Sequence, residues 1–406
     1  MDENTLEPRL VTKTAEPLPP LVDTPEVLGT LSQQIRHGTG CVGLDTERAG
    51  SFRYFQGAYL VQLRTTQTGT FLLDPTAFED FTSLNDAIGK REWILHDATQ
   101  DMPCLAELGM FPQALFDTAV AARLLNLDTF SLVGLLEHFL NVTLEKKHAT
   151  ADWSTRPLRQ EWLDYAALDV EFLIPLRERM REQLLSEGKD DWAHQEFEHL
   201  LGFHAPPEKP DPWRHVPGSG KVQSPRNLAA LRELWQAREE IARRENQAPT
   251  KVMTNAAMIA LATHLPSGKR YMNALADFRH DRHGRSRADT WFSALQRAAK
   301  LPSNKLPPRR APKKSGEVPD ARSFNHNHLP EAERWHRLRD TVTRSAEEVD
   351  VNPEIMLEPK TVRQLAWVLP DGASESQVLE VLEASQARPW QIERLLKKLT
   401  NTLRTK

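Results

Sequence analysis

The segment Cys41-Val42-Gly43-Leu44-Asp45-Thr46-Glu47 joins a short apolar run to two acidic residues. A run of this length and composition is typical of a buried β-strand. Because side chains two positions apart on a strand point to the same face, Asp45 and Glu47 are expected to converge at the end of this strand. Hard cations such as Mg²⁺ prefer oxygen ligands, so a pair of carboxylates placed in this way is a candidate part of a metal site.

The rest of residues 25–202 continues with strand and helix signals. Strand-like runs occupy residues 59–64, 70–73 and 93–96. Helical spacing appears after them, and residues 159–180 are expected to form a helix. Several strands in series, followed by alternating helices and strands, predict a layered α/β domain with a mixed sheet.

Three proline-rich segments mark the ends of this domain and of the domains that follow. Residues 1–24 are expected to form a flexible tail, and residues 203–222 and 303–328 are expected to form linkers. Residues 305–314 carry five basic side chains and no acid. That basic run is either a solvated tether or an arm that contacts phosphates.

The two segments after the linkers, residues 223–302 and 329–400, are related to each other by a shift of 104 positions. The shift superposes apolar and helix-ending landmarks: Pro249 on Pro353, Leu261-Ala262 on Leu365-Ala366, Leu265-Pro266 on Leu369-Pro370 and Leu275 on Leu379. Matches of this kind at one offset indicate a duplicated small helical domain. Two copies are too few for a solenoid, so we expect two separate domains on tethers.

Composition narrows the class of protein further. The 406 residues include only two cysteines, Cys41 and Cys104, which excludes a disulfide framework and a cysteine zinc site and fits a reducing cytoplasm. No apolar run approaches the length of a membrane span, and the acidic start does not resemble a secretory signal. Residues 1–200 carry 17 basic against 32 acidic side chains, and residues 201–406 carry 35 against 24. An acidic half joined to a basic half suggests a carboxylate-rich site beside a polyanion-binding region.

A second acidic cluster follows the strand that ends at His96. It reads His96-Asp97-Ala98-Thr99-Gln100-Asp101, with Thr99 as an expected helix N-cap and Pro103 in the first turn. Asp101 is then expected to project from the start of the helix. An acid at this place also complements the helix dipole without any catalytic role, so the cluster alone does not decide between the two interpretations.

A third cluster lies in the helix expected over residues 159–180. Tyr165 and Asp169 are four positions apart, so they occupy one face of that helix a turn apart. By itself this pair is equally typical of a core tyrosine beside a surface acid.

The joint order of the three clusters is specific. A strand with D-x-E, then H-x-A-x-x-D leading into a helix, then Y-x-x-x-D on a later helix resembles the tyrosine-containing branch of the DEDD exonuclease superfamily, and more closely bacterial ribonuclease D. The resemblance covers residues 25–200 and extends to residues outside the clusters: Tyr59-Leu60-Val61-Gln62-Leu63, Leu72-Leu73-Asp74-Pro75, Phe116-Asp117-Thr118, Asp152-Trp153 and Arg156-Pro157-Leu158. It implies a ribonuclease H-like (DnaQ-like) α/β domain, followed by two small all-α domains of the HRDC type.

The resemblance also implies a site and a chemistry. Hydrolysis of a phosphodiester by two divalent ions, Mg²⁺ or Mn²⁺, requires several carboxylates in one pocket. Asp45 is expected to bridge both ions, Glu47 and Asp169 to complete the first site, and Asp101 to hold the second through water. Tyr165 is expected to orient the attacking water. By contrast, His96 is expected to pack beside the site, Asp117 to fix a helix start and Arg156 to fix a loop.

The implied activity is 3′–5′ removal of 5′-mononucleotides from RNA, with transfer RNA 3′ ends as the implied substrate and a cytoplasmic monomer as the implied state. A 3′–5′ DNA exonuclease on the same metal site stays an alternative, because no residue identifies recognition of the 2′-hydroxyl. A non-catalytic nucleic-acid-binding module is a second alternative, although all four acids and the tyrosine are present. A helicase is excluded because the sequence has no G-x-x-x-x-G-K-[ST] phosphate loop.

A basic surface is expected in the first helical domain. Residues 211–300 carry 16 basic against 8 acidic side chains. Part of this excess is concentrated in one expected loop that contains Arg279, His280, Arg282, His283, Arg285 and Arg287. A sequence-tolerant contact with phosphates fits this pattern, and a solvated loop is the alternative.

Overall fold

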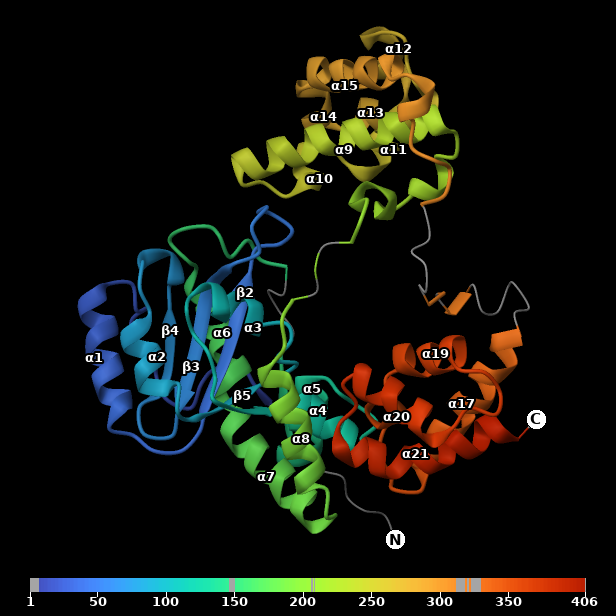
Figure 1. Cartoon of the computed structure of the whole chain (residues 1–406). Helices are drawn as coiled ribbons and strands as arrows, with labels where there is room; N and C mark the ends of the chain where they lie inside the picture. Colours follow the sequence, from blue (N-terminus) through green and yellow to red (C-terminus); the bar gives the residue numbers. More distant parts are fainter. Residues whose placement is uncertain are drawn as a thin grey trace.

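The computed structural model describes residues 7–145, 150–205, 207, 209–311, 318–319, 321–322 and 330–405. An α/β domain carries the first half of the chain, and two helical domains follow (Figure 1). In the described part of the chain, no helix combines the length and the apolar character needed to cross a bilayer.

The α/β domain is built on a five-stranded mixed sheet, as predicted, with the strand order β4-β3-β2-β5-β6. The strands within the described residues are β1 (Arg9–Val11), β2 (Val42–Arg48), β3 (Ala58–Thr65), β4 (Gly69–Leu73), β5 (Glu92–Leu95), β6 (Ala114–Asp117) and β7 (Val142–Leu144). The central strand β2 is antiparallel to β3 and parallel to β5. Strands β1, β6 and β7, which are three or four residues long, were not among the predicted runs.

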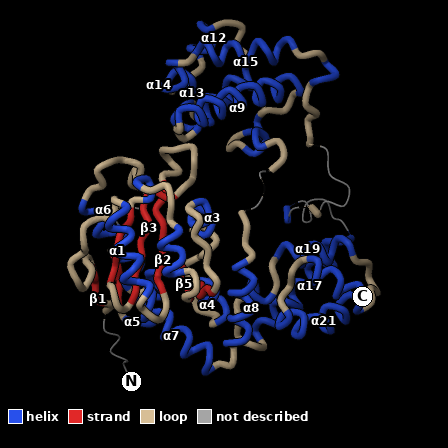
Figure 2. The backbone as a smooth tube through the Cα atoms, turned by 60° about the vertical axis from the view of Figure 1, so that its left-hand side comes forward, coloured by secondary structure: helices blue, strands red, loops and turns tan. Residues whose placement is uncertain are grey.

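Helices cover both faces of this sheet (Figure 2). One face packs against α1 (Pro25–Arg36), α2 (Thr82–Ile88) and α3 (Met102–Glu107). Val42 and Leu44 of β2 point into this core, so the intervening residues of β2 point to the other face. There Gly43 allows close contact, since a Cβ on it would lie 3.3 Å from Cβ of Leu173.

The second face is covered by α6 (Gln160–Glu171) and α7 (Leu173–Ser186). Helices α4 (Thr118–Leu124) and α8 (Asp190–Leu201) pack beside the edge strand β6, and α5 (Leu132–Leu140) packs on α7. The helical prediction for residues 159–180 is confirmed for residues 160–171 and 173–180, but the structure ends α6 at Glu171 and starts α7 after Phe172. Pro175 explains the break. Its ring would clash with the carbonyl of residue 171 in a continuous helix, whereas the first turn of a new helix accepts it.

The flexible tail predicted for residues 1–24 is also wrong for the part that the structure describes. β1 pairs in parallel with β7, and Val22 bridges to Leu73 at the edge of the sheet. The backbone N–H of Val22 donates to the carbonyl of Leu72 at 2.9 Å. Val11 and Val22 are buried, so their side chains anchor this segment to the domain. Backbone groups of β7 and β4 that would otherwise be unpaired at strand edges also bind it. The prolines of the segment gave no sign of these contacts. Residues 1–6 lie outside the described residues.

The first helical domain follows the first linker. Its helices are α9 (Pro225–Glu245), α10 (Pro249–Val252), α11 (Asn255–His264), α12 (Lys269–Ala274), α13 (Ala276–His280), α14 (Arg282–Ser286) and α15 (Ala288–Lys300). Part of the predicted linker belongs to this domain, because Trp213 and Val222 are buried in its core. Of the second predicted linker, Arg309 donates to Gln223 at 2.8 Å, and residues 312–317, 320 and 323–329 lie outside the described residues.

The second helical domain shares part of the helix pattern of the first. It contains α17 (Pro330–Glu347), α18 (Pro353–Met356), α19 (Pro359–Val368), α20 (Glu375–Ala384) and α21 (Pro389–Arg404). The bounds of α10 and α11, moved by 104 positions, coincide with those of α18 and α19. The repeat of apolar and proline landmarks therefore correctly predicted that α10 and α11 are equivalent to α18 and α19.

The prediction that both helical domains hang on tethers is wrong for the second one. It packs against α4 and α8 and shares a continuous apolar core with the α/β domain (Figure 1). Glu196 of α8 is buried, and it accepts hydrogen bonds from Arg388 at 2.8 Å and from the indole of Trp390 at 2.7 Å. Trp192 stacks on Trp390 with ring centroids 4.9 Å apart. Linker composition carries no information about such a contact, which depends on matching surfaces.

Candidate metal-dependent active site

Three of the four predicted acids meet on the face of the sheet that α6 covers. Asp45 and Glu47 alternate with inward-facing residues of β2, and Asp169 comes from the helix above them. One carboxylate oxygen of each lies within 4.8 Å of the others. The strand spacing and the helix spacing thus bring together residues that are more than 120 positions apart in the sequence.

Asp101 lies beside this group, at the N-cap position of α3, and is 4% exposed. Its carboxylate accepts a hydrogen bond of 2.5 Å from the hydroxyl of Thr46, the residue between Asp45 and Glu47. The prediction that Thr99 is the N-cap is wrong. The hydroxyl of Thr99 instead donates to Asp97 at 2.9 Å in the preceding turn. The sequence reasoning placed Asp101 at the helix start correctly but did not single out Thr46, which fixes its orientation.

Burial and mutual repulsion raise the pKa of every acid in the cluster. The pKa of Glu47 rises to about 8 and that of Asp169 to about 7, in both cases mainly because burial disfavours the charged form. The pKa of Asp101 rises to about 6 for the same reason, against the lowering effect of the Thr46 hydrogen bond. The pKa of Asp45 lies well above its ordinary value, through burial and then through the charges of Asp101, Asp169 and Glu47.

Carboxylates in this arrangement repel one another unless a cation neutralises them. The donor set of the cluster is made of oxygens alone, which suits Mg²⁺ or Mn²⁺ and does not suit the softer metals that thiolates and imidazoles select. The acids present therefore fit a site for hard divalent ions.

Tyr165 lies one turn before Asp169 on α6. Burial is the largest cause of the raised pKa of its phenol, and Asp169, Glu47 and Asp45 add to it. The hydroxyl consequently stays protonated at neutral pH and can donate a hydrogen bond next to the acids.

The neighbouring polar residues position the site and are not part of it. Nδ1 of His96 lies 2.8 Å from the hydroxyl of Thr118, and burial lowers the pKa of the imidazole to about 4. Asp117 caps α4 and also accepts from the N–H of Ala98 at 2.7 Å, so it holds the turn that leads to Asp101. Arg156 forms an ion pair with Asp74, as expected for a residue that fixes a loop.

The loop after β2 connects the site to the first helical domain. Oδ1 of Asn246 accepts hydrogen bonds of 3.2 Å from the backbone N–H groups of Tyr54 and Phe55. The N–H of Ala248 donates to the carbonyl of Phe52 at 2.9 Å. The sequence did not predict this contact. Asparagine is a typical residue for the left-handed position at which α9 ends, so Asn246 could have been predicted as the end of that helix but not as a contact of the loop after β2.

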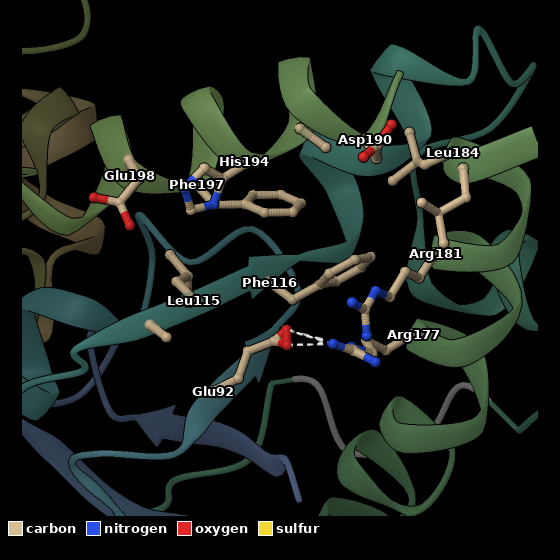
Figure 3. Close-up of a pocket in the computed structure, with 13 residues that line it drawn as sticks. Glu92, Leu115, Phe116, Arg177, Arg181, Leu184, Asp190, His194, Phe197 and Glu198 are labelled. Atoms are coloured by element: carbon tan, nitrogen blue, oxygen red, sulfur yellow. Dashed lines mark hydrogen bonds and ion pairs between the residues drawn. The ribbon is translucent and has the colours of Figure 1, made fainter. Parts of the chain in front are cut away.

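A cavity of about 380 Å³ lies elsewhere, between β6, α7 and α8 (Figure 3). The pair of Glu92 and Arg177 lines it, with Nη2 of Arg177 donating to Oε1 of Glu92 at 2.8 Å. Glu92 begins β5, whereas Asp101 follows the other end of that strand. None of the five predicted site residues lines this cavity, so it is separate from the acidic cluster.

The chain matches three family models, described as 3′-5′ exonuclease over residues 20–185, HRDC domain over residues 227–279, and 3′ to 5′ exonuclease C-terminal domain over residues 317–403. It is 28% identical to ribonuclease D of Pseudomonas paraeruginosa over 368 residues, which cover 89% of this chain and 92% of that protein. Over most of its length the chain is similar to the ribonuclease D-like 3′–5′ exonucleases. Its second helical domain, which the sequence predicts to be HRDC-like, matches a model with a different description.

Two further comparisons show how much of this ribonuclease D-like chain its relatives share. The exosome complex exonuclease RRP6 of Saccharomyces cerevisiae is 28% identical over 270 residues, or 62% of this chain and 36% of RRP6. The chain thus spans about a third of the length of that relative. A crystal structure of a protein from Bifidobacterium adolescentis has a TM-score of 0.88 and 34% identity, and the match covers 98% of this chain and 100% of that one.

The raised pKa values make metal binding dependent on pH. Carboxyl groups that are partly protonated at pH 7 must lose protons to bind a cation, so Mn²⁺ affinity is expected to rise from pH 6 to pH 8 as Asp101, Asp169 and Glu47 ionise. Titration calorimetry at pH 7 in two buffers with different ionisation enthalpies is expected to show net proton release. An affinity that stays constant between pH 6 and pH 8 would contradict the assigned environment of these acids.

Proposed function

We propose that this chain is a 3′–5′ exoribonuclease that releases 5′-mononucleotides from RNA 3′ ends and depends on two divalent ions. The observation that carries the proposal is the meeting of Asp45, Glu47 and Asp169 within 4.8 Å, with Asp101 beside them. The match to 3′-5′ exonuclease models at the same residues supports the direction of cleavage. The resemblance to ribonuclease D supports RNA as the substrate.

Asp45, Glu47, Asp169 and Asp101 are the residues that would hold the ions. When bound, the ions supply activation of a water molecule and stabilisation of the leaving oxygen. The charges of the other three acids all act on Asp45 and contribute to its raised pKa. We propose that it is shared between the two ions, and that Glu47 and Asp169 complete one site and Asp101 the other.

The remaining residues act by orientation. The protonated phenol of Tyr165 would donate a hydrogen bond to the attacking water beside Glu47 and Asp169. Thr46 holds the carboxylate of Asp101 through its hydroxyl. Asp117 fixes the turn before Asp101 by accepting from the N–H of Ala98. These contacts reduce the reorganisation that the site must undergo during the reaction.

Transfer RNA precursors are the substrate that the ribonuclease D resemblance favours, and we propose a monomer that acts on their 3′ ends. Basic side chains of the first helical domain would hold the RNA body. The arginines predicted to share one loop instead occupy two short helices, α13 and α14, where Asp281 caps the second. Arg279, Arg282 and Arg285 are exposed there, whereas Arg287 pairs with Glu245.

This basic surface leads to a prediction about salt dependence. Replacing Arg279, Arg282 and Arg285 together with alanine is expected to reduce the slope of log affinity against log salt by about 2, at ~0.7 per phosphate contact on single strands. Binding of a 3′-extended transfer RNA, measured in chelator to prevent cleavage, gives the slope. The matched control removes two exposed arginines of α7, Arg179 and Arg181. A parental slope in the triple variant would remove the proposed contact.

The proposed activity is tested with single strands of identical sequence in RNA and in DNA, each labelled at the 5′ end. With Mg²⁺ or Mn²⁺, RNA is expected to shorten one nucleotide at a time and to release 5′-mononucleotides, and chelator is expected to stop the reaction. A 3′-phosphate should block it. Faster digestion of DNA would favour the alternative DNA exonuclease, and no digestion of either strand would favour a binding module.

A further inference from the structure

Gln62 is a polar residue in the middle of β3 that the chemistry described above does not use. Its side chain is 0% exposed. Neither Oε1 nor Nε2 has a hydrogen-bond partner among the residues that the structure describes. Buried polar atoms are paired in the great majority of cases, so an amide with both atoms unpaired requires an explanation.

The surroundings of Gln62 do not supply a partner by themselves. On the same strand and face, Leu60 packs into the apolar cluster beneath α6. Arg64, two positions further along, is paired with Glu171 at 2.7 Å. An apolar side chain at position 62 would continue the cluster around Leu60, and it would avoid the cost of burying an unpaired amide.

The strand register places Gln62 next to the acids. It is the direct partner of Asp45 in the antiparallel pairing of β2 with β3. Directly opposed residues share a face of the sheet, with Cβ atoms about 4.5–5.5 Å apart. An amide with two rotatable bonds beyond Cβ spans that distance to a carboxylate. Glu47 is opposite Leu60 and Gly43 is opposite Arg64, so neither neighbour of Asp45 on this face has an amide across from it.

We propose that Gln62 is a positioning residue for the metal site, and that its amide N–H donates a hydrogen bond to the carboxylate of Asp45 when divalent ions are bound. The proposal rests on the proposed function, because it assigns Asp45 to the ions. Residues that orient metal ligands in this way typically change metal affinity or activity 10–100-fold when they are replaced. On this proposal, the protein without metal tolerates the unfavourable burial of an unpaired amide because the amide is needed as a donor once the ions bind.

The test uses the full chain with Gln62→Met, which keeps a similar length and removes both polar atoms. Two measurements are expected to separate, with Mn²⁺ affinity falling while stability does not. In chelator, the melting temperature should stay equal or rise, because two unpaired buried atoms are gone. By calorimetry, Mn²⁺ affinity should fall 10–100-fold. Thr263→Val is the matched control, since Thr263 Oγ1 is also buried and unpaired but lies in the first helical domain, and its Mn²⁺ affinity should be parental.

Parental Mn²⁺ affinity in Gln62→Met would overturn the proposal, whatever the melting temperature. If Gln62→Met fails to fold, then Gln62→Asn, which keeps the amide but shortens its reach, gives the same readout; parental affinity there would again overturn it. Failure of the proposed function is distinguishable, because it is read from the parental protein alone: a parental protein that binds no Mn²⁺ lacks the metal site, and one that binds Mn²⁺ but digests DNA faster than RNA has a different substrate.

Discussion

Asparagine in place of Asp45 is expected to reduce RNA hydrolysis by about 10³-fold or more, which corresponds to ~4 kcal/mol of lost transition-state stabilisation. Asp45 is the acid on which the charges of Glu47, Asp101 and Asp169 all act, so it is the residue expected to contact both ions. The amide keeps the volume of the side chain and removes the negative charge. Single-turnover digestion of a 5′-labelled RNA at saturating Mn²⁺ measures the effect, and a rate within tenfold of the parental one would contradict the assignment.

The same variant is expected to stabilise the metal-free fold at alkaline pH. A carboxyl group whose pKa is raised on folding favours the folded state at acidic pH, and that advantage is lost as pH rises through the raised value. Asp45→Asn removes the charge that must otherwise be buried. In chelator, its melting temperature should exceed the parental one at pH 8, and the difference should shrink at pH 5. Asp86→Asn, at an exposed position of α2, is the control that should show neither effect.

Phenylalanine in place of Tyr165 is expected to lower turnover by about 10²–10³-fold, the range for removing a group that orients or transfers a proton. The substitution deletes one hydroxyl and leaves the ring packed on α6, so the acids and their Mn²⁺ affinity should be unaffected. Turnover and calorimetric Mn²⁺ affinity separate the two effects. Asp45→Asn and Tyr165→Phe are the two substitutions expected to lower RNA digestion most.

The matched control for this variant is Tyr59→Phe, which deletes the same group from a tyrosine of β3 in the apolar cluster beneath α6. Tyr59→Phe should digest RNA at the parental rate. If Tyr165→Phe does so as well, the phenol has no part in the reaction. If it loses Mn²⁺ affinity along with turnover, Tyr165 supports the metal site and does not orient the water.

The parts of the site that depend on local periodicity could be predicted from the sequence. Asp45 and Glu47 share a face because they are two residues apart on a strand, and Tyr165 and Asp169 share a face because they are four apart on a helix. These two regularities, with the order of the clusters, were sufficient to identify the family.

The parts that depend on long-range contacts could not be predicted. Thr46 acts on Asp101 across 55 positions, and Asn246 reaches Tyr54 across 192. Gln62 stands out only when the register of β2 and β3 is known. The docking of the second helical domain depends on the buried hydrogen bonds of Glu196, an acid that no local pattern distinguishes from the other acids of α8.

Asp45, Glu47, Asp101 and Asp169 are proposed to hold two divalent ions together. Anomalous diffraction from crystals of the full chain soaked in Mn²⁺ would locate these ions. The expected map has two peaks about 4 Å apart, the separation usual for two-metal sites, with the Asp45 carboxylate in contact with both. A map without manganese among these four carboxylates, at a concentration of Mn²⁺ that supports RNA digestion, would contradict the proposal.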